Sequence, residues 1–227
     1  MPRIYRISKF GTRILQKIRH RRGHGIHSPF VFSLITKVIE EKRAYYAYTD
    51  IPEYIQPFPE IKKASLKNNR LIFRLTNYFN SKNILEIGAG DGQTTLYASA
   101  YANDIIYNCI EISQHKYEKA TNLYSKWNRR IFLHTEKLPI LKKKQDCIIV
   151  CLKNYNADFE LFSDYILHLC HEKSFIIIKD IRTKRRNQVL WRKLKSLGIV
   201  TVSIDLFNIG ILFFDKKLYK RNYRLNF

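Results

Sequence analysis

From residue 83 onward, short apolar runs alternate with stretches whose apolar residues recur at helical intervals. Runs of four to eight apolar residues have the length of buried strands, whereas apolar residues spaced three and four apart indicate helices. The strand-like runs lie at residues 83–87, 105–112, 131–134, 146–152 and 175–181, and the helical patterns lie at 94–102, 114–127, 159–170 and 184–197. This alternation predicts a mostly parallel sheet with helices on both faces.

The last two apolar runs, 199–207 and 210–215, follow each other with no helix between them. They predict an antiparallel hairpin with its turn near Asn208. We therefore expect an α/β fold with a Rossmann-like, mostly parallel seven-stranded sheet that ends in a C-terminal antiparallel hairpin.

The first 80 residues follow a different pattern. Residues 3–22 place apolar side chains at helical intervals among Arg and Lys, as in a basic amphipathic helix. Such a segment can lie on a membrane or RNA surface, but packing on its own domain is the simpler use. Ser28 and Pro29 form an N-cap and a first helical position, so we expect helices over residues 29–44 and 62–79, joined by an irregular, proline-marked connection. The predicted organisation is an N-terminal helical extension (1–80) followed by one α/β domain (81–227).

The most unusual bulk property is charge: 41 Lys and Arg residues stand against 19 Asp and Glu residues, a formal net charge of +22. Such a charge attracts nucleic acid, anionic membrane surfaces or acidic substrates. Compositional drift toward Lys, Asn, Ile and Tyr is the alternative, although it does not explain the many arginines. Since net charge carries no fold or site information, a nucleic-acid partner stays open at this point.

The N-terminus lacks the apolar stretch and small-residue cleavage site of a secretory signal, and no apolar run is long enough to span a bilayer. None of the four cysteines forms a CxxC pair, and three lie in apolar stretches, as is typical of reduced, buried thiols. These features predict a cytoplasmic protein. They leave its oligomeric state undetermined.

A glycine-rich turn follows the first predicted strand, in the sequence Glu86-Ile87-Gly88-Ala89-Gly90-Asp91-Gly92. Glycines let the backbone turn tightly and approach a ligand that a Cβ would exclude. The spacing is GxGxG with an acid two residues upstream, unlike the GxGxxG of dinucleotide sites, where a helix N-terminus meets a pyrophosphate. A nucleotide-binding relative or a bare structural turn remains the alternative.

A second acidic residue, Glu111, ends the next predicted strand 21 residues after Gly90. A carboxylate at this place can accept hydrogen bonds from both hydroxyls of a ribose. Because NAD enzymes use the same device, Glu111 separates the cofactors only in combination with the acid-led loop and the terminal hairpin.

The segments LEIGAGDGQTT and CIEIS resemble motifs I and II of the class I S-adenosylmethionine (SAM)-dependent methyltransferases. The resemblance covers residues 83–215 and implies SAM as the cofactor. By this resemblance the cofactor-binding residues of the loop are Gly88, Ala89, Gly90, Asp91 and Gly92.

Further cofactor contacts follow from the same resemblance. Glu86 is expected near the methionine portion of SAM, and Glu111 with Ile112 at the ribose. Glu136, just past the third strand, is a candidate for an adenine contact, although an exposed loop glutamate is an equally good explanation.

A closer resemblance is to bacterial methyltransferases of the catechol O-methyltransferase type, in particular a group that carries an RGHGIHSPFVF stretch, found here at residues 22–32. In the metal-dependent members, acids at the ends of strands four and five hold a divalent cation that polarises substrate hydroxyls. Here Cys151 takes the first of these positions, and Lys179 precedes the one remaining acid, Asp180. We therefore expect no catalytic metal.

The candidate catalytic residues are His24, His27 and Asp180. Either histidine is a candidate general base or lid contact, and the alternative is a helix-entry histidine satisfied by backbone groups. Asp180 is a candidate base or cofactor-side anchor, and the alternative is a cap for the following helix.

Three functions remain open from the sequence. The first is a metal-independent SAM-dependent methyltransferase that acts on an oxygen or nitrogen of a small-molecule acceptor. The second is an RNA methyltransferase with a basic binding surface, although the chain has no NPPY-like tetrapeptide and no appended RNA-binding module. The third is a degenerate SAM-binding protein without catalysis, which the loss of the metal acids suggests.

Overall fold

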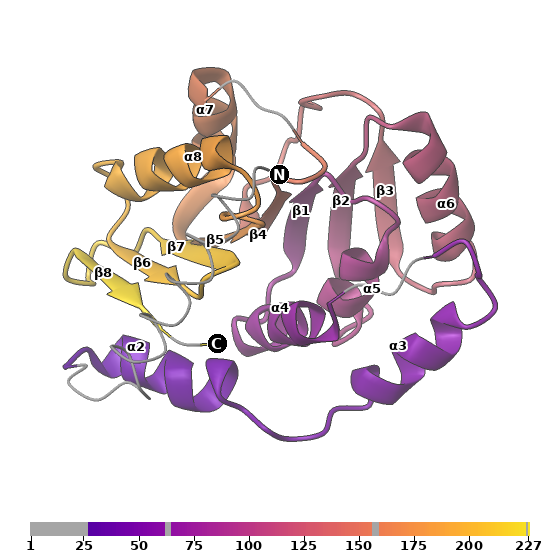
Figure 1. Cartoon of the computed structure of the whole chain (residues 1–227), viewed down its shortest axis with the longest axis horizontal. Helices are drawn as coiled ribbons and strands as arrows, with labels where there is room; N and C mark the ends of the chain where they lie inside the picture. The colour runs from indigo at the N-terminus through magenta and orange to yellow at the C-terminus, as the bar shows by residue number, and fades with distance from the viewer. Residues whose placement is uncertain (1–26, 62–64, 156–158, 226) are drawn as a thin grey trace.

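The computed structural model describes residues 27–61, 65–155, 159–225 and 227. The amphipathic segment 3–22 and the candidate His24 lie outside the described residues. A central sheet has eight strands in the order β3-β2-β1-β4-β5-β7-β6-β8 (Figure 1). The strands are β1 (Asn83–Ile87), β2 (Ile106–Ile110), β3 (Arg130–His134), β4 (Gln145–Cys151), β5 (Cys170–Lys179), β6 (Val202–Asp205), β7 (Ile209–Phe213) and β8 (Arg221–Arg224).

Strands β1 to β5 are parallel, and β7 pairs antiparallel with both β5 and β6. The predicted Rossmann-like sheet with a C-terminal antiparallel hairpin is confirmed. The eighth strand, β8, was not predicted from the sequence; it adds to the edge, parallel to β6. Its sequence, RNYR, is charged and mostly exposed, as edge strands commonly are, so it lacks the apolar pattern by which the other strands were identified.

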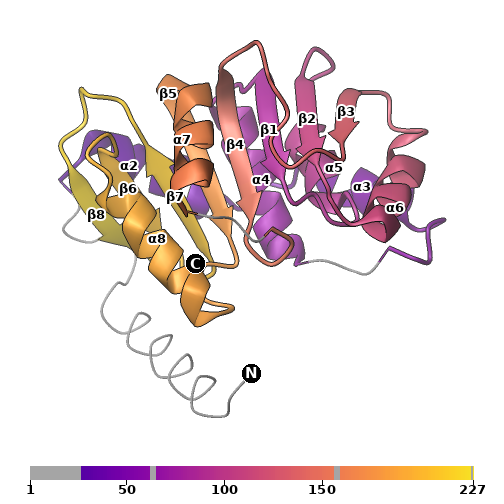
Figure 2. The ribbon, with the colours of Figure 1, turned by 90° about the horizontal axis from the view of Figure 1, so that it is seen from above.

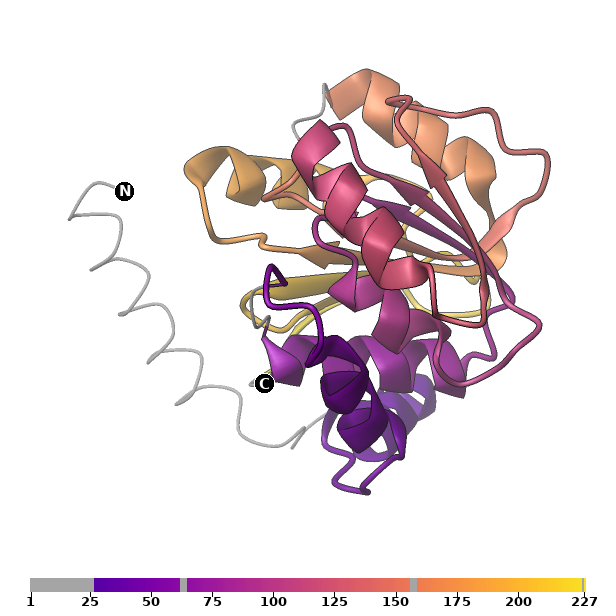
Figure 3. The same ribbon diagram turned by 90° about the vertical axis from the view of Figure 1, so that its right-hand side faces the viewer.

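Helices cover both faces of the sheet (Figures 2 and 3). The helical elements are α2 (Pro29–Leu34), the π-helical turn η1 (Ile35–Ile39), α3 (Ala47–Ile55), α4 (Leu66–Tyr78), α5 (Gln93–Ser99), α6 (Gln114–Tyr124), α7 (Phe159–Leu169) and α8 (Arg185–Ser196). Alternate residues of β4 show the layering, because Cys147 and Ile149 join the core under α2, η1 and α4, whereas Ile148 and Val150 join the core under α7 and α8. No helix in the described part of the chain has both the length and the apolar character of a bilayer span.

The N-terminal helices differ from the prediction in two places. Ser28 does cap α2, its Oγ accepting from the Val31 N–H at 3.4 Å, and Pro29 is the first helical residue. The predicted helix over 29–44, however, ends with η1 at Ile39. The predicted irregular connection contains α3, which runs through Pro52; burial of one face of α3 against α4 and α5 outweighs the hydrogen bond that the proline removes.

The end of η1 is held by a buried arginine of α4. Arg74 is 8% exposed and donates from Nε to the Val38 carbonyl at 2.6 Å and from an NH2 group to the Ile39 carbonyl at 3.3 Å. A third bond runs from Arg74 to the Tyr48 hydroxyl at 3.0 Å, which ties α3 to the same point. Because terminal helix carbonyls need partners, this one side chain satisfies the end of η1 and joins three helical elements.

Arg74→Met should lower the free energy of unfolding by about 1–3 kcal/mol, because it leaves two buried carbonyls without donors. Arg185→Met, at an exposed position at the start of α8, is the matched control and should change it by less than about 0.5 kcal/mol. Urea unfolding followed by circular dichroism measures both. Equal stability of the two variants would show that Arg74 does not hold η1.

Candidate functional site

The glycine turn between β1 and α5 has three glycines in the left-handed region, with φ of +80° at Gly88, +68° at Gly90 and +86° at Gly92. A Cβ at Gly92 would lie 2.7 Å from the Tyr124 ring, so packing alone requires this glycine. A Cβ at Gly90 would meet only the side-chain amide of Asn154. Gly90 therefore leaves room for this amide, and among the three glycines it is the one that lines the cavity described below.

Glu111 fixes the turn from the neighbouring strand. Its Oε2 accepts the Gly90 N–H at 2.7 Å and its Oε1 accepts the Ser113 N–H at 2.9 Å, and the side chain is buried. The Gly88 and Ala89 N–H groups bond to the carbonyl of Ile110 at the end of β2. Glu111 thus binds the loop backbone in this structure, and its contact with a ribose stays a prediction.

Glu86 lies beneath the turn and is fully buried. Its Oε2 accepts hydrogen bonds from Thr95 Oγ1 at 2.7 Å and from the Tyr107 hydroxyl at 2.8 Å, while Oε1 has no hydrogen-bond partner in the described part of the chain. Burial raises the pKa of Glu86 above its ordinary value, and the positive charge of Lys179 offsets part of this effect.

A cavity of about 580 Å³ opens at the carboxyl ends of β1, β4 and β5. Binding sites of open α/β sheets lie at this edge, and small-molecule pockets typically have volumes of about 300–1,000 Å³. Four of the predicted site residues line the cavity: Ala89, Gly90, Asp91 and Asp180.

The other predicted residues lie outside the cavity wall. They are Glu86, Gly88, Gly92, Glu111, Ile112, Glu136 and His27. Ile112 and Glu136 are exposed. His27 is exposed just before α2, where nearby Phe30 packs on Phe213 of β7, with ring centroids 5.0 Å apart. Phe213 pairs with Phe175, four residues before the carboxyl end of β5 at Lys179. The structure does not bring His27 to the cavity.

The ends of β4 and β5 supply the chemistry of the cavity. Lys179 Nζ donates to Thr94 Oγ1 at 2.5 Å, and the Cys151 thiol donates to Asp180 Oδ2 at 3.4 Å. Burial raises the pKa of Cys151, so the thiol is neutral at pH 7. Residue Lys184, not Asp180, is the N-cap of α8, which leaves the Asp180 carboxylate at the cavity wall.

Two further features of the wall were missed by sequence reasoning. Asn69 on α4 is 2% exposed; its Oδ1 accepts from Thr94 at 3.3 Å, and its Nδ2 has no hydrogen-bond partner among the residues described. Asn154 covers the glycine turn, donating to the Gly88 carbonyl at 3.0 Å and accepting from Lys116 Nζ at 3.0 Å. Asn69 follows no motif, because its place at the cavity depends on how α4 packs.

Cationic side chains outnumber acidic ones around the cavity. The cationic or titratable nitrogen side chains are His115, Lys116, Lys119, Lys153 and Lys179, and the acidic ones are Glu60, Asp91 and Asp180. Across residues 27–61, 65–155, 159–225 and 227, no group of three His, Cys, Asp or Glu side chains is placed to hold a metal ion. The cavity suits a ligand that carries negative charge on the side of Lys179.

No protein-family model matches the sequence, and no curated protein matches it. Solved structures do match. An SAH-bound methyltransferase from Podospora anserina is 14% identical, with 83% of this chain and 97% of that one covered and a TM-score of 0.61. A methyltransferase from Geobacter sulfurreducens is 11% identical, with 78% and 93% covered and a TM-score of 0.60.

The O-methyltransferase from Bacillus cereus, in complex with SAH, is 16% identical, with 81% and 96% covered and a TM-score of 0.55. At such identities the likeness establishes the fold. The chain has the fold of the class I SAM-dependent O-methyltransferases, in agreement with the resemblance carried by its glycine turn and terminal hairpin.

Glu86→Gln should make stability less dependent on pH. Because burial raises the folded-state pKa above 4.5, the wild-type carboxyl contributes stability when protonated and loses it as pH rises through the folded pKa. The free energy of unfolding of the variant minus that of the wild type should therefore increase above pH 4.5, by up to about 1.4 kcal/mol per pH unit. Denaturant unfolding from pH 4 to 8 measures it, with the exposed Glu136→Gln as matched control. A difference that falls with pH would contradict this account of Glu86.

Proposed function

We propose that the chain is a SAM-dependent methyltransferase that acts on an oxygen, or a nitrogen, of a small-molecule acceptor without a catalytic metal. The observation that carries the proposal is the 580 Å³ cavity, which Gly90 lines together with residues at the ends of β4 and β5. The related structures from Podospora anserina and Bacillus cereus contain SAH, and one O-methyltransferase of this fold, TomG from Streptomyces achromogenes, contains SAM.

The residues present fit such a cofactor. The turn offers a glycine where a ligand can approach the backbone, and the buried Asn69 amide offers an unused donor at the same wall. Ala89, Gly90 and Asp91 would hold the cofactor from the side of the turn. When bound, SAM supplies a methyl group on a positively charged sulfur, which a nucleophile displaces in line.

We assign the catalytic roles to Asp180 and Lys179. The Asp180 carboxylate can take the proton of the acceptor's hydroxyl or amine, as a general base within the cavity. The Lys179 ammonium donates a hydrogen bond to Thr94 and lies at the cavity wall, where it can stabilise negative charge on an acceptor oxygen. Holding both reactants in the cavity supplies a further share of the rate, on the order of 7–11 kcal/mol in favourable cases.

Lys179 also supports the metal-free part of the proposal. An ammonium group at the end of β5 repels a divalent cation, and the neutral Cys151 thiol at the end of β4 is a poor ligand for Mg²⁺, which binds oxygen. In this proposal the Lys179 ammonium supplies the positive charge that a bound divalent metal ion would otherwise supply.

Gly90→Arg should abolish cofactor binding, with a loss of more than about 100-fold in affinity, because the new side chain enters the cavity. Gly198→Arg is the matched control: a Cβ there meets nothing within 4 Å, and affinity should be unchanged. Isothermal calorimetry with SAM and SAH measures both, and thermal melts verify folding. Absence of wild-type binding at hundreds of micromolar would reject the proposed function, and equal affinity of Gly90→Arg and wild type would place the cofactor elsewhere.

Lys179→Met should lower kcat/KM for an acceptor on the order of 100-fold, with SAM affinity changed less than about threefold. The matched control is Lys153→Met, which removes a positive charge from the same wall but has no bond to Thr94. SAH formation over a panel of phenols, catechols and hydroxy acids gives the rates. Wild-type SAM binding without turnover on any acceptor would favour a cofactor-binding protein without catalysis.

A further inference from the structure

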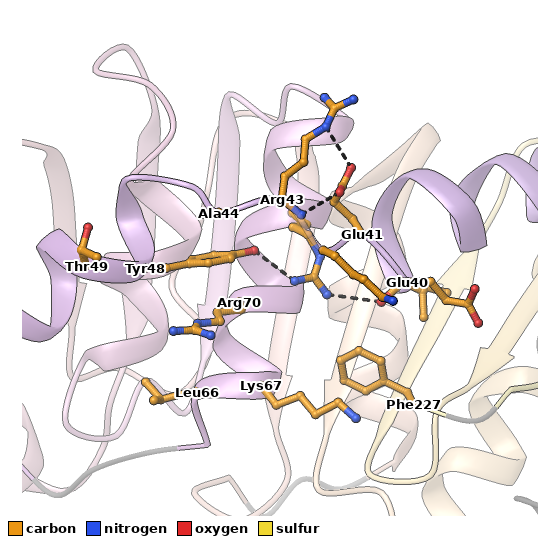
Figure 4. A pocket seen from close by; sticks show the side chains of 13 residues that line it. Glu40, Glu41, Arg43, Ala44, Tyr48, Thr49, Leu66, Lys67, Arg70 and Phe227 are labelled. Carbon is orange, nitrogen blue, oxygen red and sulfur yellow. Dashed lines mark hydrogen bonds and ion pairs between the residues drawn. The ribbon is translucent and has the colours of Figure 1, made fainter.

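A second and larger hollow lies on the other side of α4. This groove, of about 1150 Å³, is bounded by the end of η1, the loop after it, the first turn of α3, one face of α4 and the C-terminal Phe227 (Figure 4). Leu66, Lys67 and Arg70 face the groove, whereas Asn68 and Asn69 face the 580 Å³ cavity, and none of the described residues lines both. The groove is thus a separate site with α4 as the dividing wall.

The groove is cationic. Among the residues that the structure describes, five basic side chains line it against two acidic ones: the basic ones are Lys42, Arg43, Lys67, Arg70 and Arg74, and the acidic ones are Glu40 and Glu41. Glu41 is already engaged, because it accepts the Arg43 N–H at 2.8 Å and pairs with the Arg43 side chain at 3.8 Å, and these bonds lower its pKa. The wall therefore has positive charge that its own carboxylates do not neutralise.

Arg70 is the central feature of this wall (Figure 4). Its guanidinium lies 4.6 Å from the centre of the Tyr48 ring, and its buried Nε has no hydrogen-bond partner within the described part of the chain. The stacking platform is rigid, because the Tyr48 hydroxyl is held by Arg74, which the end of η1 holds in turn. A guanidinium fixed by stacking and without a carboxylate partner in the described chain offers a preorganised fork of donors for a phosphate.

The groove is also aromatic. Tyr48 lies at one end, and the Phe227 ring, with Lys67 Nζ 4.2 Å from its centre, lies at the other. The groove volume of about 1150 Å³ is larger than a single phosphate group requires. Proteins that bind single-stranded nucleic acids combine aromatic side chains, on which the bases stack, with basic side chains that neutralise the phosphate backbone.

From these observations we propose that the α3–α4 groove binds nucleotide phosphates, with a base stacked on an aromatic wall and a phosphate on Arg70. The source of the phosphate is either a single-stranded nucleic acid or a free nucleotide. The net charge of +22 favours the strand. This site is independent of the cofactor cavity and does not rest on methyl transfer.

Fluorescence anisotropy of the full chain with a labelled ten-nucleotide uridine strand tests the proposal, at several salt concentrations. Arg70→Gln should weaken binding at least about tenfold and reduce the slope of log K against log salt by about 0.7, the value for one lost phosphate contact on a single strand. Arg185→Gln, the same change of charge at an exposed position on α8 across the sheet, is the matched control and should leave the slope unchanged.

Phe227→Ala provides a second variant, which does not remove charge and lies at the chain end. It should weaken binding at least about fivefold, with the salt slope unchanged. Competition by uridine monophosphate at millimolar concentration identifies a free nucleotide as the ligand, and resistance to it identifies the strand.

Two results overturn the proposal. One is no binding of the strand or of the nucleotide by the wild-type chain at 100 mM salt. The other is an equal loss for Arg70→Gln and Arg185→Gln, which would show diffuse attraction to net charge. The Gly90→Arg variant should bind the strand as the wild type does, so that failure of the cofactor site and failure of the groove are distinguishable.

Discussion

The hydrogen bond between the Gly90 N–H and the buried Glu111 carboxylate joins the ends of β1 and β2, and the candidate site depends on it. Positive φ angles at Gly88, Gly90 and Gly92 give the turn a backbone shape that favours glycine. Glu111 supplies an acceptor that fixes this turn beside the parallel strands, whose carboxyl ends meet at one edge. Loss of that acceptor would leave the buried Gly90 N–H unpaired and would no longer hold the glycine turn at the cavity wall.

An electrostatic interaction links Glu86, below the glycine turn, to Lys179 at the end of β5. Glu86 is buried below the turn, and the nearby Lys179 charge offsets part of its desolvation. The same ammonium bonds to Thr94 and faces the cavity. A lysine at the end of β5 therefore offsets part of the desolvation of a buried carboxylate and also brings a basic group to the cavity wall.

The sequence predicted what local pattern determines and missed what packing determines. Periodicity identified the strands with apolar runs, including the half-exposed edge strand β3, but not β8, whose sequence RNYR has no such run. Pro52 suggested a break where α3 forms, because burial of the helix face could not be known in advance. The glycine turn was recognisable by its spacing, whereas Asn69 reaches the cavity only through the packing of α4, far from the turn in sequence.

The position of α4 explains how the fold presents two hollows, one on either side of a single helix. Successive residues on a helix point about 100° apart, so Asn69 lines the 580 Å³ cavity while the next residue, Arg70, lines the groove. The helix itself is fixed by the apolar residues Leu71, Ile72 and Leu75 in the core under the sheet. Because the core, and not either hollow, sets the place of α4, a substitution at Arg70 leaves Asn69 in position, and the chemistry of each hollow can be changed without the other.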